Sequence, residues 1–272
     1  MEKRLLYIAF AIFLSAAGCT TEIDIKPVGE KEKLVVLGEI SASDSVIAHL
    51  SMAKNVSQET VPVSSLTNAQ VQLFDTQNNL ITTLQHRQNN KWSSPFITAA
   101  QQTYHFKATV NGKTAEITTT IPRPFSAIIT KQESYSGLIT EVTIQINNEN
   151  KSAAYYVIEY LQAKNNGGLK LQSIESSDPK TDNYIYNELS KPYDRLFVRT
   201  DNSKKTVTLR ILKPNLDDKY VLRIKSVDPD YYRYLYNYEV QKDNYALMEL
   251  SPSDQSYLGI LGGVYKIDFH IK

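Results

Sequence analysis

Residues 104–121 read YHFKATVNGKTAEITTTI, and this stretch predicts a β-hairpin. In the first arm apolar and polar side chains alternate, which places four apolar residues on one face: Tyr104, Phe106, Ala108 and Val110. Asn111-Gly112 accepts the positive φ values of a type I′ turn, whose twist suits adjacent antiparallel strands. The second arm supplies the matching apolar face with Ala115, Ile117 and Ile121. The stretch therefore indicates an antiparallel sheet with one face in a core.

The same period of two recurs along the chain and predicts a mainly β protein. Alternating or apolar runs indicate further strands at 33–37, 46–52, 69–73, 142–146, 154–161, 207–211, 220–224 and 264–271. We expect an immunoglobulin-like or transthyretin-like β-sandwich at 33–122 and a second β-rich domain at 123–272. The boundary is placed at Pro122-Arg123-Pro124, because proline cannot donate to a strand ladder and stiffens the connection. Gly259–Gly263 is expected to be a flexible connector before the last strand.

One helix is expected, after Asp228-Pro229-Asp230. Aspartate caps helices, and proline is favoured at the first helical position. In a helix, residues at i, i+3, i+4 and i+7 would form one stripe: Tyr231, Tyr234, Leu235 and Tyr238. The alternative is a strand, since alternate positions between 232 and 238 are also all tyrosine. The Asp-Pro start favours the helix.

Composition excludes several classes of protein. The chain has 272 residues, 42% of them hydrophobic, with 30 Lys+Arg against 29 Asp+Glu. This is an ordinary globular composition, so global disorder and a disulfide scaffold are excluded. A charge near zero also argues against general nucleic-acid binding, which needs a basic excess.

The N-terminus is typical of a lipoprotein. Residues 1–18 combine Lys3 and Arg4 with a 13-residue apolar run, too short for a membrane span and suited to a signal peptide. Ala16-Ala17-Gly18 leads directly into Cys19, the one cysteine, an arrangement that resembles a bacterial lipobox. Cleavage there would leave 28 positive and 28 negative charges on 254 residues, so the lipid would have to provide the attachment. Residues 19–32 are interpreted as a tether; an ordinary cleaved signal peptide is the alternative.

Motifs for catalysis or cofactors are missing from the sequence. There is no HExxH, no histidine pair at helical spacing, no nucleophile elbow and no phosphate-binding glycine loop. We therefore expect no metal site, no cofactor and no catalytic residue. A glycosidase needs only a carboxylate pair, which a sequence cannot exclude, and the acids lack the spacing of an EF-hand.

Tyrosine is over-represented in the second half. Of 18 tyrosines, 16 lie from Tyr135 onward. Such rings suit the recognition of sugars, peptides or proteins, although tyrosine is also common in strands and sandwich cores. The residues predicted to bind a ligand or partner are Asp178, Tyr184, Tyr186, Tyr193, Asp201, Tyr232 and Tyr236.

Several blocks, taken in order, resemble one family. They are the lipobox cysteine with acidic Glu22 and Asp24, then KLVVLGEI (33–40), AQVQL (69–73), the Asn111-Gly112-Lys113 hairpin, TTTIP (118–122), SSDP (176–179), the 197–209 stretch, DYYRYL (230–235) and GGVY (262–265). This order resembles the Bacteroidota outer-membrane lipoproteins that carry domain of unknown function DUF4249. The resemblance implies a lipid-anchored outer-membrane protein, on the cell surface rather than the periplasmic face. It also implies a partnership with a TonB-dependent, SusC/SusD-type transporter, and it carries over no catalytic residue.

The expected function is therefore that of a non-enzymatic accessory or binding subunit of an uptake or envelope complex. Its partners would be the outer membrane, a transporter, and a glycan or peptide ligand, with no nucleic acid. The alternative is a stand-alone surface adhesin or glycan-binding lipoprotein.

Overall fold

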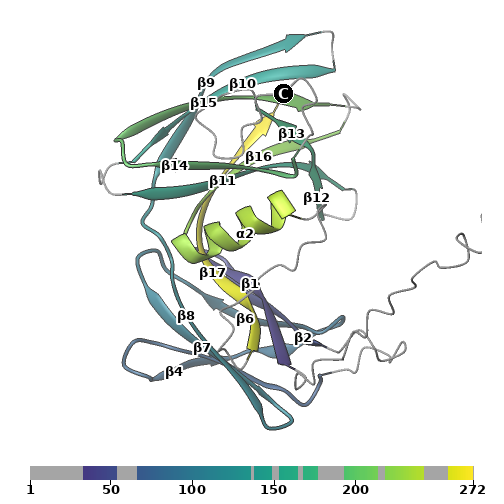
Figure 1. Cartoon of the computed structure of the whole chain (residues 1–272), viewed down its shortest axis with the longest axis vertical. Coiled ribbons are helices and arrows are strands. Elements are labelled where there is room, and N and C mark those ends of the chain that lie inside the picture. The colour runs from purple at the N-terminus through teal and green to yellow at the C-terminus, as the bar shows by residue number, and fades with distance from the viewer. Residues whose placement is uncertain are drawn as a thin grey trace, which may run out of the picture. The chain divides into compact units, whose positions relative to one another are not determined.

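The computed structural model describes residues 33–53, 66–135, 138–148, 153–164, 168–176, 193–213, 218–241 and 257–271. In chain order its elements are β1 (Lys33–Ser41), β2 (Ser45–Ala53), β3 (Gln70–Phe74), β4 (Leu80–Thr83), β5 (Gln85–His86), β6 (Lys91–Ile97), β7 (Thr103–Val110), β8 (Lys113–Thr120), β9 (Ser126–Tyr135), β10 (Ile139–Asn147), β11 (Ala154–Ala163), β12 (Leu169–Gln172), β13 (Ile174–Glu175), β14 (Arg195–Thr200), β15 (Lys204–Leu212), β16 (Tyr220–Val227), α2 (Pro229–Gln241) and β17 (Tyr257–Ile271) (Figure 1). The prediction of a mainly β protein is confirmed.

The described strands form three sheets. Sheet A runs β12-β11-β16-β17-β1-β2-β6-β5, with β14 also paired to β11. Sheet B runs β4-β3-β7-β8, and sheet C runs β13-β15-β10-β9. The long strand β17 lies in the middle of sheet A and joins its two halves: its first part pairs with β1 in parallel, and its last part pairs with β16 antiparallel. Sheet A thus contains strands from both sides of the Pro122–Arg123 boundary, and the division into two domains stays a prediction.

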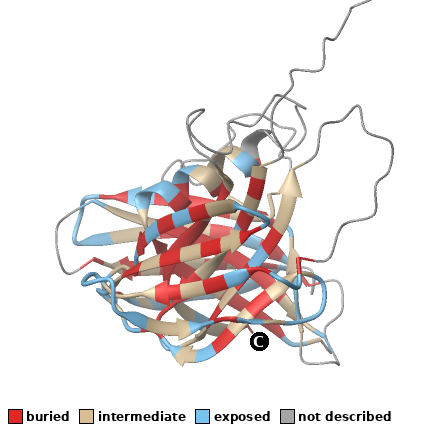
Figure 2. Ribbon diagram, turned by 90° about the horizontal axis from the view of Figure 1, so that it is seen from below, coloured by how far each residue is buried: buried red, intermediate tan, exposed pale blue. Residues whose placement is uncertain are grey.

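Three apolar cores lie against sheet A, the smallest of them beneath α2, where Tyr231, Tyr232 and Leu235 pack with Val157, Phe197, Val227 and Val264. Buried positions alternate with less buried ones along the strands (Figure 2). In the first core, side chains of β1, β2 and β6 pack with those of β3, β7 and β8, and Trp92 is buried among them. In the second, side chains of β11 and β16 pack with those of β10 and β15. This alternation is the reason that the period of two located most strands correctly.

The predicted hairpin is confirmed. Strands β7 and β8 pair from Thr103↔Thr120 to Val110↔Lys113. Asn111 and Gly112 have φ values of 50° and 75°, as a type I′ turn requires at its two central positions.

Strand β17 corrects the expectation of a flexible glycine connector. The strand begins at Tyr257, so Gly259–Gly263 lies within it. These glycines allow close packing: a Cβ on Gly262 would lie 2.0 Å from the Tyr231 ring, and one on Gly263 would lie 2.2 Å from the carbonyl oxygen of Thr120. Glycine is therefore needed at these positions, because a side chain would collide with the neighbouring ring or backbone.

Helix α2 is formed as the Asp-Pro start indicates, so the strand alternative is excluded. Asp228 Oδ1 accepts a hydrogen bond from the Tyr231 N–H at 2.9 Å, the geometry of an N-cap. The other oxygen of Asp228 accepts one from the Gly263 N–H at 2.6 Å and one from the Thr119 hydroxyl at 3.3 Å. Burial raises the pKa of Asp228, and this effect outweighs the three hydrogen bonds, which lower it. One side chain thus connects α2 to β17 and β8.

The predicted stripe on α2 was only partly correct. Tyr231 and Leu235 are buried, but Tyr238 is 43% exposed. Glu239 is buried instead, at 2% exposure. The reason is a set of polar partners beneath the helix end, described below, which the apolar pattern could not indicate.

Replacing Asp228 with alanine is expected to lower the free energy of unfolding by about 2–4 kcal/mol. The change removes an N-cap, worth about 0.5–2 kcal/mol, and leaves the Gly263 N–H without its acceptor, which costs about 1–3 kcal/mol. Urea unfolding followed by circular dichroism measures the loss. Asp230→Ala is the matched control: Asp230 is exposed in the first helical turn, and its loss should cost less than about 1 kcal/mol. Equal losses in the two variants would contradict the connecting role of Asp228.

Candidate functional site

A pocket of about 430 Å³ lies where α2 meets β11 and β14. We call it the tyrosine–arginine pocket, after the residues that line it: Tyr155, Arg199, Pro229, Tyr232, Arg233 and Tyr236. Its volume falls in the range of small-molecule sites, about 300–1,000 Å³.

The aromatic side of the pocket is held by ring packing. Tyr232 and Tyr236 are four residues apart on α2, so their rings lie one above the other, 6.4 Å apart and 7° from parallel. Phe197 of β14 is fully buried and meets both rings edge-on, at 5.4 Å in each case. Tyr155 contacts Tyr232 at 5.1 Å. Such edge-to-face pairs fix ring orientation and are worth about 0.5–1.5 kcal/mol each beyond buried area.

Positive charge lines the open side. Arg199 lies directly opposite Tyr155 in the pairing of β14 with β11, and its side chain is exposed. Arg233 is also exposed and makes a 3.5 Å ion pair with Asp230, whose side chain is 78% exposed. Lys205 adds a third cation nearby, since its Nζ donates to the Arg199 carbonyl oxygen at 3.5 Å. The described residues that line the pocket include two arginines and no carboxylate.

A second pocket, of about 410 Å³, adjoins the first. We call it the connector pocket because residues 120–125, which link β8 to β9, form one wall. The rest of the lining comes from residues 153–156, residues 226–229, Gln101 and Asn148. Tyr155 and Pro229 line both pockets, so the two share a wall.

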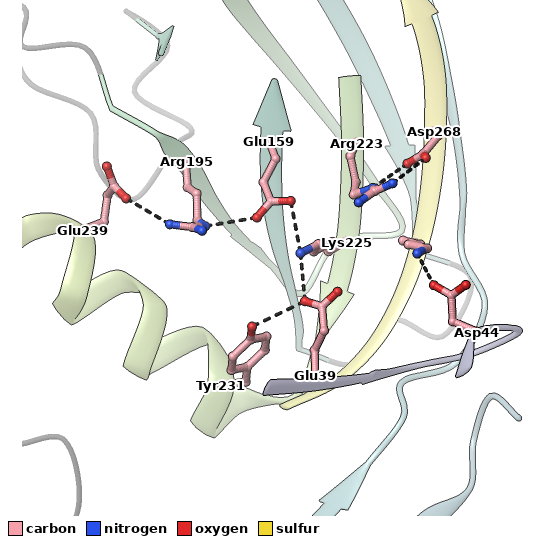
Figure 3. A network of polar contacts seen from close by, with 10 residues as sticks. Glu39, Asp44, Glu159, Arg195, Arg223, Lys225, Tyr231, Glu239 and Asp268 are labelled. Carbon is pink, nitrogen blue, oxygen red and sulfur yellow. Dashed lines mark hydrogen bonds and ion pairs between the residues drawn. The ribbon is translucent and has the colours of Figure 1, made fainter. Parts of the chain in front are cut away.

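The helix that carries the tyrosines is fixed to sheet A by a chain of buried and half-buried charges (Figure 3). Lys225 Nζ lies 2.9 Å from Glu39 Oε2 and 3.1 Å from Glu159 Oε2. Arg195 Nε lies 3.0 Å from Glu159 Oε1, and Arg195 Nη1 lies 3.6 Å from Glu239 Oε2 on α2. The chain of contacts therefore runs from β1 through β16, β11 and β14 to the end of the helix.

Two further contacts complete this network. The hydroxyl of Tyr231, on the first turn of α2, donates to Glu39 Oε2 at 3.4 Å. The Asp194 N–H donates to Glu239 Oε1 at 2.7 Å. The helix is thus bound to sheet A near both of its ends.

The charges in the network stabilise one another. Burial opposes ionisation of Glu159, but Lys225 and Arg195 outweigh it and lower the pKa of Glu159. Burial likewise opposes the charge of Lys225, but Glu159 and Glu39 outweigh it and raise its pKa. Burial, followed by Glu39, raises the pKa of Tyr231 well above its ordinary value. We therefore interpret the network as a structural support for α2.

The predicted binding residues do not form one cluster. Tyr232 and Tyr236 lie together in the tyrosine–arginine pocket. Tyr193 instead bridges Ile174 through two backbone hydrogen bonds and packs against the second core. Asp201 is exposed in the turn between β14 and β15. Cys19, Asp178, Tyr184 and Tyr186 lie outside the described residues. That any of these residues binds a ligand stays a prediction.

Sequence reasoning missed four residues around the pocket. Arg233 is three residues before Tyr236, so helical spacing alone could have placed it there. Tyr155, Phe197 and Arg199 give no such signal, because the pairing of β11 with β14 brings them together.

The described residues hold neither a cluster of metal ligands nor a membrane-spanning helix. They contain no group of three or more His, Cys, Asp or Glu side chains placed to hold a metal ion. Among them, no helix has both the length and the apolar character to span a membrane.

Several solved structures show remote similarity to this chain. Escherichia coli alpha-2-macroglobulin activated by porcine elastase matches at 9% identity and a TM-score of 0.25, covering 89% of this chain and 20% of that one. Bovine butyrophilin matches at 9% identity and a TM-score of 0.24, covering 88% and 99%. A beta-glycosidase from Bacteroides vulgatus matches at 15% identity and a TM-score of 0.22, covering 72% and 23%. This chain thus spans about a fifth of the length of the alpha-2-macroglobulin chain.

Comparison with curated proteins gave no match. The model of one protein family, domain of unknown function DUF4249, matches residues 20–255. That range covers most of the chain and includes the strands and the helix that form both pockets, so the family resemblance of the sequence is confirmed. The protein belongs to the DUF4249 family.

Proposed function

We propose that this protein is a non-enzymatic lipoprotein of the outer membrane that serves as an accessory or binding subunit of a TonB-dependent, SusC/SusD-type uptake complex. The tyrosine–arginine pocket carries the binding role, because it combines rings fixed by packing with exposed arginines. The lipobox-like Cys19 supports the anchor, and the cell surface is the proposed location.

The chemistry around the pocket supports binding rather than catalysis. General acid–base catalysis is most often carried by a histidine or a carboxylate within reach of the substrate. The described lining of the tyrosine–arginine pocket includes no carboxylate and no histidine. Glu159, further along β11, is buried and ion-paired to Lys225 and Arg195, which holds it as a structural carboxylate.

Replacing Cys19 with serine is expected to release the protein from the envelope. A hydroxyl cannot form the thioether to lipid, and a body with no net charge gains little from anionic headgroups. Fractionation of cells that express the wild type or Cys19→Ser measures the fraction that sediments with membranes. Circular dichroism of both proteins checks that the fold is unchanged. A variant that sediments as the wild type does would contradict the lipid anchor.

The transporter partnership is tested by co-purification. Outer membranes solubilised in mild detergent should yield the tagged protein together with a TonB-dependent transporter. Cys19→Ser is the control, because it should lose the transporter as it loses the membrane. Recovery of the wild type always alone would contradict the partnership.

The alternative, a stand-alone glycan-binding adhesin, is favoured by one observation: Tyr155, Arg199 and Tyr236 all line the pocket from this one chain, so the pocket needs no second protein to form. Glycan binding by whole cells that lack the transporter would support this alternative. Binding that disappears with the transporter would support the uptake complex.

A further inference from the structure

We propose that the tyrosine–arginine pocket binds a carboxylated sugar ring and that the ligand, an acidic oligosaccharide, continues into the connector pocket. The inference rests on the binding role proposed above and specifies its ligand class. Charge, shape and the continuity of the two pockets support it.

The charge of the pocket selects an anion. Arg199 and Arg233 line it, and Lys205 lies within hydrogen-bonding distance of the Arg199 backbone. The pair between Arg233 and Asp230 is exposed at both ends, so it holds the guanidinium weakly. A guanidinium binds a carboxylate through two parallel hydrogen bonds, which makes a carboxylate a fitting partner for either arginine.

The shape of the pocket selects a ring. Tyr236 is partly exposed, and packing against the buried Phe197 and the buried Tyr232 fixes its ring, so it presents a preformed aromatic surface beside the arginines. Such a surface offers flat contact area with little loss of side-chain entropy on binding. A sugar ring supplies an apolar face for this surface, and its carboxylate can reach the arginines at the edge.

The connector pocket gives room for further sugar units, so the ligand is an oligomer. This pocket shares Tyr155 and Pro229 with the first pocket, and the two volumes are similar, about 410 and 430 Å³. Its lining includes another arginine, Arg123, the polar residues Asn148 and Ser226, and the carboxylate of Asp228, whose oxygens accept hydrogen bonds from Tyr231, Gly263 and Thr119. A chain of several acidic sugars would therefore meet a cation in each pocket.

The test is isothermal titration calorimetry on the full chain in mild detergent, with galacturonic acid, trigalacturonate and hexagalacturonate as probes. Neutral oligosaccharides of the same lengths, inorganic phosphate and benzoate are the comparison ligands. We expect the hexamer to bind at least about tenfold more tightly than the neutral hexamer, since hydrogen bonds to a charged group typically give that factor. Equal binding of acidic and neutral sugars would overturn the inference, as would phosphate or benzoate binding as tightly as the hexamer.

Variants assign the contribution of each pocket. Arg199→Gln should weaken hexamer binding at least about tenfold, and Tyr236→Ala should weaken it several-fold, while Tyr236→Phe should keep the ring surface and most of the affinity. Arg123→Gln should weaken hexamer binding and leave galacturonic acid unchanged. Arg87→Gln, an exposed arginine that lines neither pocket, is the control and should bind as the wild type does.

The results separate this inference from the proposed function. No binding of the acidic series, with membrane attachment and transporter co-purification intact, would overturn the ligand class alone. Binding that responds to the variants, in a protein without anchor or transporter, would overturn the proposed complex and leave the ligand class standing. Binding that ignores every pocket variant would overturn the assignment of the site.

Discussion

Replacing Lys225 with methionine is expected to lower the free energy of unfolding by about 3–5 kcal/mol, because it removes one partner from a buried ion pair. Lys225 is 6% exposed, and its Nζ is shared between Glu39 at 2.9 Å and Glu159 at 3.1 Å. Methionine keeps most of the side-chain volume but leaves Glu159 buried with less compensation. Urea unfolding, with the slope of the transition compared between proteins, measures the effect.

An exposed ion pair provides the control for Lys225→Met. Lys107 lies 2.7 Å from Glu116, with side chains 45% and 66% exposed, so Lys107→Met should cost less than about 1 kcal/mol. Adding Glu159→Gln to Lys225→Met should recover part of the loss, because the carboxylate left with less compensation becomes neutral. Equal losses in Lys225→Met and Lys107→Met would show that burial does not strengthen this network.

Acid provides a second readout of the same network. The folded-state pKa of Glu159 is lowered from 4.5, so the unfolded chain binds more protons in the window below that value. The stability that this group contributes is present above pH 4.5 and is lost as the pH falls through the lowered pKa. Lys225→Met removes the main charge that lowers this pKa, so the variant should lose less of its remaining stability in that window.

Replacing Gly262 with alanine is expected to lower the free energy of unfolding by about 3 kcal/mol, the upper end of the usual cost of overpacking. The new Cβ would lie 2.0 Å from the Tyr231 ring, so the ring or the strand must move. Tyr231 cannot move freely, because its hydroxyl donates to Glu39 and its N–H donates to Asp228. The helix should therefore shift away from β17. Urea unfolding measures the loss of stability, and near-ultraviolet circular dichroism reports the tyrosine packing.

A double-mutant cycle identifies the cause of the Gly262 effect. Tyr231→Ala removes the ring that the new Cβ would meet, so Gly262→Ala should cost much less in that background. Gly112→Ala is the control for glycine itself: its φ is +75° with nothing within 4 Å, so strain alone should cost about 1–2 kcal/mol. Additive losses for Gly262→Ala and Tyr231→Ala would contradict the proposed clash.

Much of the local structure could be predicted from the sequence. The hairpin over 104–121 combines a period of two with Asn111-Gly112, and both signals depend only on nearby residues. The start of α2 was equally clear, because Asp228 caps a helix whose first residue is Pro229. Family membership could also be recognised, since ordered blocks along the chain carry it.

The candidate site could be predicted only in part. Tyr232 and Tyr236 were selected because tyrosines crowd this segment, and the helix places their rings together. Tyr155 and Arg199 were not selected, because they meet through the pairing of β11 with β14. Strand pairing brings together residues from distant parts of the chain, and such contacts have no short-range pattern in the sequence.

The sequence by itself determined the alternation of the strands, the hairpin turn and the helix start, because each depends on residues a few positions apart. Only the tertiary structure decided that Gly259–Gly263 lies in a strand, and that Lys225 and Glu159 are buried although both are charged. The physical reason is α2, which covers a face of sheet A and encloses these charges, together with β17, which pairs with β1 from the far end of the chain. Lys225 and Glu39 are 186 residues apart in the sequence and 2.9 Å apart in the fold.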